Sequence, residues 1–303
     1  MIGISNHQEY YTAHYFEEIL PTDLKETSAR WKETALAHPD SEAHREPTAR
    51  LKGSIRNYFR ALEQFQKSGK PETQRRHLAG LLDILGYPLK TDWITLGESA
   101  KSLRIPVLAQ ETKQSGAPAL WVLEALPSGR EDADIATSPL NLAPTAEQYA
   151  DDPQNADPQI IGTRPPKDLP WEDLISKHIF ALEEPPRWLL LVSLGQLVLI
   201  DRLKWGERRF IAFDLRELFN RREDATLSTL CALLHRESTC PADGLPLHDG
   251  LSENSHKNAF SVSEDLKLAV VASVEDLANE AVWYFRNVRK EGIFNQPTQE
   301  LEA

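Results

Sequence analysis

The chain has 303 residues, 41% of them apolar and 26% charged, a composition that is ordinary for a globular protein with material for one large domain or two smaller ones. It carries 34 Lys and Arg against 46 Asp and Glu, and this net charge of −12 argues against strong autonomous binding of nucleic acid. No apolar run approaches the ~20 residues needed to span a bilayer, and the N-terminus shows no signal pattern. We therefore expect a cytoplasmic protein with no membrane partner.

The charge is unevenly distributed. Residues 1–90 carry 13 basic and 12 acidic side chains, a difference of +1, whereas residues 130–186 carry 4 and 12, a difference of −8. A near-neutral surface thus remains available at the N-terminus. The two cysteines fit a reducing compartment without a disulfide framework.

Residues 1–90 are expected to form a helical N-terminal region. Aromatic and aliphatic residues recur at helical spacing from His7 to Leu20, and a longer helix is expected from Ala49 to Gln66. The face of this helix opposite its apolar stripe holds four basic residues, Arg50, Lys52, Arg56 and Arg60. These are candidate contacts for a DNA backbone, and the alternative is a solvated helix face.

The pattern changes to strands beyond a fourth helix, which runs from Glu72 to Leu85 and ends at Gly86. The expected elements that follow are a strand between Asp92 and Ser102, strands at 104–111 and 119–126, a long acidic insertion at 127–170, a short helix at 171–180, strands at 187–193, 197–203 and 208–213, a helix at 225–235, a flexible loop at 238–262 and a long helix from Ser263 to about Arg289.

The strand at 119–126 is almost entirely apolar but contains one carboxylate, Glu124. Such a run suits a strand that is buried on both faces, where an ionisable group is costly unless it is paired, bound to a metal or at the mouth of a site. Glu124 is therefore either part of a functional site, present or ancestral, or a buried carboxylate paired with an Arg or with backbone amides.

The order helix, strand, strand, strand, helix, strand from residue 71 onward resembles the αβββαβ core of the PD-(D/E)XK restriction-nuclease-like fold. The fold class is accordingly α+β: a helical N-terminal region, a nuclease-like mixed sheet at 91–235 and a long C-terminal helix within 236–303. In that family an Asp on one strand and a Glu-x-Lys on the next hold Mg²⁺, which polarises the scissile phosphate.

Several short motifs extend the resemblance to the N-terminal region of large type IIG-like adenine DNA methyltransferases, including those of DISARM- and BREX-type phage-defence systems. They are the helix end Leu81–Tyr87, the strand and turn Arg187–Gly195, the strand Leu197–Asp201 and the opening His7–Tyr11. The resemblance implies that the methylase, which would bind S-adenosylmethionine, lies elsewhere in a longer polypeptide, because this sequence has no Asn-Pro-Pro-Tyr/Phe motif. It also implies DNA or defence-system subunits as partners.

The sequence departs from the nuclease pattern at decisive positions. Glu124 matches the family's Glu, but Leu126 stands where the Lys is expected, and no acid occurs at Leu108–Gln110, where the family's Asp would lie. We therefore expect a non-catalytic nuclease-like module that needs no cofactor of its own.

Two alternatives stay open. In an active Mg²⁺-dependent endonuclease, Asp92, Glu111 and Glu124 would be the metal ligands and Lys113 would assist the nucleophile. In an acidic adaptor, the segment 130–186 would mimic DNA or bind a basic partner.

Overall fold

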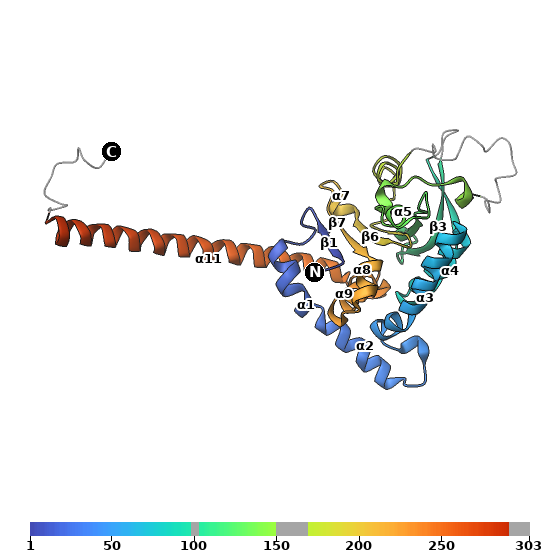
Figure 1. Cartoon of the computed structure of the whole chain (residues 1–303), viewed down its shortest axis with the longest axis horizontal. Coiled ribbons are helices and arrows are strands. Elements are labelled where there is room, and N and C mark those ends of the chain that lie inside the picture. Colours follow the sequence, from blue (N-terminus) through green and yellow to red (C-terminus); the bar gives the residue numbers. More distant parts are fainter. Residues whose placement is uncertain (98–102, 150–168, 291–303) are drawn as a thin grey trace. The chain divides into compact units, whose positions relative to one another are not determined.

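The computed structural model describes residues 1–97, 103–149 and 169–290 (Figure 1). Its chain divides into two compact units, Met1–Glu253 and a second that begins at Asn254. The boundaries expected near residues 90 and 235 both lie within the first unit. None of the helices in the described part of the chain combines the length and the hydropathy that crossing a bilayer requires.

The first unit is built on a seven-stranded sheet with the order β1-β7-β6-β5-β4-β3-β2. Its strands are β1 (Ile4–His7), β2 (Asp92–Leu96), β3 (Leu103–Thr112), β4 (Pro118–Glu124), β5 (Trp188–Val192), β6 (Gln196–Asp201) and β7 (Phe210–Asp214). Neighbouring strands are antiparallel except β4 and β5, which are parallel. A parallel pair needs a crossover connection, and the chain between these strands contains α6 (Trp171–Leu174) and the π-helical turn η7 (Ile175–Ile179).

The remaining helices are α1 (Leu20–Asp23), α2 (Lys25–Ala37), α3 (Pro47–Ser68), α4 (Pro71–Ile84), α5 (Asp132–Ile135), α7 (Arg202–Trp205), α8 (Leu215–Arg221), α9 (Asp224–Leu234), α10 (Arg236–Thr239) and α11 (Leu247–Tyr284), with π-helical turns η1 (Tyr15–Ile19) and η8 (Phe285–Arg289) and 3-10 turns at Glu42–His44, Pro139–Asn141 and Ala146–Tyr149. From α4 onward the order is α4, β2, β3, β4, α6–η7 and β5, with the short α5 and two 3-10 turns in the described residues between β4 and α6. Apart from these short elements this is the expected αβββαβ, and the predicted α+β class with a mixed sheet is confirmed.

Both faces of the sheet are covered, which explains why its central strands read as unbroken apolar runs. Alternate side chains point to opposite faces of a strand. In β4, Leu120 and Val122 join a core with α3, α4 and α9, whereas Trp121 and Leu123 join a second core with α6 and η7. Helices α3 and α4 lie side by side (Figure 1). The sheet is thus the middle of three layers.

The helix expected at 7–20 is confirmed only for residues 13–20, and the N-terminus before it departs from the prediction. Ile4–His7 pairs with β7 instead, and the chain then turns through Gln8 and Glu9, whose φ values are +51° and +55°. The Asn6 side chain holds this turn: its Nδ2 donates to the Tyr11 carbonyl at 2.7 Å, and its Oδ1 accepts from the Tyr11 N–H at 3.1 Å. Pairing with a strand about 200 residues away cannot be recognised from local periodicity.

The last helix begins at Leu247, well before the expected Ser263, so about two thirds of the expected loop at 238–262 is helical. His248 and Leu251 are buried in the first unit, and this burial stabilises the first turns of a polar stretch. Of the acidic insertion expected at 127–170, residues 127–149 form short helical turns, and 150–168 lie outside the described residues.

Candidate functional site

Glu124, the one acid of the apolar strand β4, is fully buried and forms an ion pair. Nε of Arg75, on α4, donates to its Oε2 at 2.8 Å. The Arg75 side chain is 16% exposed, so the guanidinium closes the carboxylate off from solvent. Of the two explanations that the sequence left open for Glu124, the structure shows the buried carboxylate paired with an arginine.

Two glutamines complete the environment of Glu124. Nε2 of Gln74 donates to Glu124 Oε1 and to the Ala125 carbonyl, both at 3.1 Å, while Gln74 Oε1 accepts the N–H of Leu194 at 3.2 Å. Gln148 donates to the backbone carbonyl of Glu124 at 2.8 Å. Both carboxylate oxygens are therefore engaged by the protein's own donors, and the cluster joins α4 to β4 and to the turn after β5.

The positions around Glu124 lack the other groups of a nuclease site. Leu126, in place of the family's Lys, is buried in the core, as are Leu108 and Ala109 in place of its Asp. A hard cation such as Mg²⁺ needs several oxygen ligands, and one carboxylate bound to a guanidinium offers few.

The residues of the alternative Mg²⁺ site lie on three strands. Asp92 faces Val107 across the β2–β3 pair, while Glu111 is four residues further along β3, about 13 Å at the strand rise. Glu111 faces Leu120 of β4, so Glu124 is again four residues, or about 13 Å, away along that strand. Ligands of one Mg²⁺ bind at about 2.1 Å, and the strand register keeps these carboxylates too far apart to share an ion.

Their local contacts agree with this separation. Glu111 pairs with Arg236 of α10 at 2.8 Å, and Asp92 is exposed and accepts a hydrogen bond from Gln110 at 3.2 Å. Lys113 is exposed in the hairpin after β3. Within the described residues, no group of three or more His, Cys, Asp or Glu is arranged to hold a metal ion.

Glu111 and Lys113 do line a cavity of about 490 Å³. Its other charged residues are Arg187 and Arg236, and each of these already forms ion pairs with carboxylates. The cavity therefore contains Glu111 and Lys113, which have the Glu-x-Lys spacing of the nuclease motif, but the Glu111 carboxylate is neutralised by Arg236. Sequence reasoning missed Arg236 because it lies 125 residues after Glu111 and belongs to no motif.

The four basic candidates of α3 divide into two pairs. Arg50 bonds Asp83 at 2.6 Å, and Lys52 bonds Asp224 at 2.6 Å. Arg56 and Arg60 are exposed and form no ion pair with the described residues. One helical turn separates them, so their guanidinium groups lie on the same face of α3.

A hollow of about 580 Å³ runs along this face, and we call its lining the basic groove: Lys52, Gly53, Ile55, Arg56, Phe59, Arg60, Glu63 and Arg222. Arg222 comes from the end of α8, where its φ of +56° ends the helix. Four cations against one carboxylate make the groove locally positive in a chain of net charge −12. A phosphate backbone is the ligand that this charge suits best.

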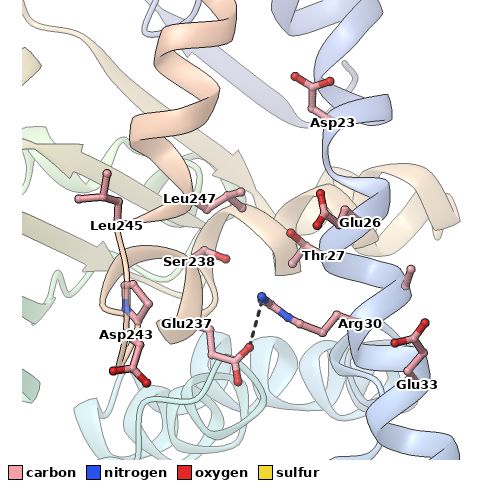
Figure 2. A pocket seen from close by; sticks show the side chains of 12 residues that line it. Asp23, Glu26, Thr27, Arg30, Glu33, Glu237, Ser238, Asp243, Leu245 and Leu247 are labelled. Carbon is pink, nitrogen blue, oxygen red and sulfur yellow. Dashed lines mark ion pairs between the residues drawn. The ribbon is translucent and has the colours of Figure 1, made fainter.

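A second hollow has the opposite charge. It measures about 540 Å³ and lies between α2 and the segment from α10 to the start of α11 (Figure 2). Arg30 reaches across it to Glu237 at 3.5 Å. Its remaining charged residues are acidic: Asp23, Glu26, Glu33 and Asp243. The charge of this face would repel phosphate, in contrast to the charge of the basic groove.

A buried polar cluster joins the N-terminal turn to the sheet and to the start of α11. The Tyr11 hydroxyl lies 2.8 Å from Nδ1 of His248, whose Nε2 lies 2.8 Å from the Leu233 carbonyl. Lys204 donates to the Tyr10 carbonyl at 2.7 Å, and burial lowers the pKa of this lysine to about 8.

Arg187 extends the cluster through ion pairs with Asp201 and Asp249. Hydrogen bonding to Arg187 lowers the pKa of Asp249. The cluster therefore brings together three of the stretches that resemble the methyltransferases: His7–Tyr11, Arg187–Gly195 and Leu197–Asp201. Most of its polar groups bond to one another, although the buried Tyr10 hydroxyl has no partner among the described residues, and we assign the cluster a structural role.

Comparisons with protein-family models, with curated proteins and with solved structures found no match to this chain.

Proposed function

We propose that this chain is a non-catalytic nuclease-like module of a DNA restriction-modification or phage-defence adenine methyltransferase, and that it positions DNA or a partner subunit for that enzyme. The observation that carries the proposal is the state of Glu124. It lies in an αβββαβ sheet on the strand that bears the Glu of the nuclease family, yet Arg75 and Gln74 occupy both of its oxygens.

The basic groove supports DNA as the molecule that is positioned. Arg56 and Arg60 are free of ion pairs with the described residues, and Arg222 adds a third exposed guanidinium. Three or four phosphate contacts against an overall charge of −12 give weak, salt-sensitive binding, as suits a module that assists another domain.

Supercoiled plasmid incubated with the chain and Mg²⁺ or Mn²⁺ is expected to stay intact, because Asp92, Glu111 and Glu124 cannot share a metal ion. Agarose gels over a time course measure nicked and linear products, with an active restriction enzyme as the positive control. Nicking that disappears in Glu111→Ala or Lys113→Ala would establish the endonuclease alternative and overturn the proposal.

Duplex DNA is expected to bind at low salt through the basic groove. The double variant Arg56→Glu/Arg60→Glu should weaken binding about tenfold or more. It should also make the plot of log affinity against log salt less steep, by about 0.9 in the magnitude of the slope for each phosphate that the protein no longer neutralises. Fluorescence anisotropy of a labelled duplex across a salt series measures both quantities.

The matched control is Arg45→Glu/Lys177→Glu, which makes the same charge change at two exposed residues outside the groove. It should leave affinity within about twofold, since distant exposed charges are screened. Equal losses in both double variants would show that only net charge matters. The basic groove would then have no specific role.

A further inference from the structure

The second unit carries exposed apolar side chains along α11. Those of Val270, Val274, Leu277 and Tyr284 are 54%, 59%, 67% and 46% exposed. Contiguous exposed apolar surface on a helix marks a site where another molecule binds. The arrangement of these residues indicates what kind of molecule that is.

One set of apolar residues on this helix follows a strict repeat. Val270, Val274, Leu277, Ala281 and Tyr284 are spaced by four, three, four and three residues. This alternation is the heptad pattern of a coiled coil, in which positions a and d form the seam. Val274 is then at position a and Leu277 at position d. The molecule that packs against these residues is therefore a helix with the same repeat.

We propose that the occupant is α11 of a second copy of this chain, bound in the antiparallel direction. In this pairing Val274 packs against Leu277 of the second copy, and Val270 packs against its Ala281. The two-fold axis passes between residues 275 and 276, so every a position meets a d position. Two copies of this chain are thus sufficient to form a complete seam.

Lys267 determines the direction. It occupies the next a position, three residues before Val270. A parallel dimer would bring the two Lys267 ammonium groups face to face inside an apolar seam, where like charges are costly. The antiparallel dimer sets Lys267 against Tyr284 of the second copy, where the aromatic ring attracts the ammonium group.

The charges at the two ends agree with this direction. Glu264 and Asp265 lie before the stripe, and Arg286 and Arg289 lie at its end. Antiparallel pairing brings the acidic end of each helix level with the basic end of the other. Parallel pairing would place the two acidic ends beside each other and the two basic ends beside each other.

Sedimentation equilibrium of the full chain over a wide concentration range tests the association. The expected mass at high concentration is twice 34.3 kDa. Leu277→Asp, in the centre of the seam, should give the monomer mass throughout. Leu268→Asp is the matched control, because Leu268 is 63% exposed on the same helix but lies off the seam, and this variant should still dimerise.

Oxidative cross-linking in a Cys240→Ser background tests the direction. The double variant Val270→Cys/Ala281→Cys should form a covalent dimer, whereas each single variant should not. Cross-linking of both single variants would show a parallel dimer. A monomer mass at every concentration, or loss of the dimer in Leu268→Asp as in Leu277→Asp, would overturn the proposed interface.

Discussion

Replacing Arg75 with methionine is expected to lower the free energy of unfolding by about 3 kcal/mol, the lower end of the range for breaking a buried ion pair. Methionine keeps most of the aliphatic stem but leaves the Glu124 carboxylate uncompensated at zero exposure. Among the described side chains, Gln74 would still donate to it. A loss of this size is a large share of the ~5–15 kcal/mol that stabilises a typical domain, and urea denaturation followed by circular dichroism measures it.

Arg50 provides the matched control for Arg75. Both arginine side chains are 16% exposed, but the partner of Arg50, Asp83, is 68% exposed, whereas Glu124 is fully buried. Arg50→Met should therefore cost no more than about 1 kcal/mol, as is usual for a pair whose acid stays hydrated.

A double-mutant cycle separates the charge from the packing. In a Glu124→Gln background the carboxylate is gone, and Arg75→Met should then cost less than half of its effect in the unmodified chain. If the cost were the same in both backgrounds, Arg75 would act through its aliphatic stem, and the ion pair would contribute nothing.

Acidification is expected to destabilise the protein between about pH 6.5 and pH 4 through His248. Burial, with Lys204 and Arg187 nearby, lowers the pKa of this imidazole from 6.5 to about 4. In this window the unfolded chain binds a proton that the folded chain does not, so falling pH favours unfolding. A shift of this size corresponds to about 3 kcal/mol once the pH is below both values.

Burial keeps the His248 ring neutral, and its hydrogen bonds define which tautomer the neutral ring adopts. The Leu233 carbonyl can only accept, so Nε2 carries the proton and Nδ1 accepts from the Tyr11 hydroxyl. Burial also lowers the pKa values of His77 and His235 to about 4, and both add losses of the same sign.

Urea denaturation at a series of pH values measures this dependence. His248→Gln, which cannot titrate, should lower stability at pH 7 but flatten the slope between pH 6.5 and pH 4. The slope that remains would come from His77, His235 and His7, because burial lowers the pKa of each of them. An unchanged slope in this variant would show that His248 does not contribute to the acid sensitivity.

Local patterns in the sequence were sufficient for the centre of the fold. The strand at 119–126 and its neighbours are apolar runs between turn formers, so burial on both faces follows from composition. The helix at 71–84 ends where Gly86 adopts its left-handed φ of +84°. The α+β class with its αβββαβ order required nothing beyond these local signals.

The roles of the charged residues required the tertiary structure. The sequence identifies Glu124 as an acid in an apolar strand, but its partner Arg75 lies 49 residues earlier on a helix packed against that strand. Likewise, Lys52 is engaged by Asp224 and Arg56 is not, although both point outward from the same helix.

The sequence alone determined that the central strands enter the core, because their burial depends on the apolar pattern that each strand carries by itself. Only the tertiary structure decided that β1 pairs with β7 and that Glu111 is neutralised by Arg236. Ion pairs and strand pairing depend on distances of a few ångströms between residues far apart in the chain. Those distances are fixed when the layers pack.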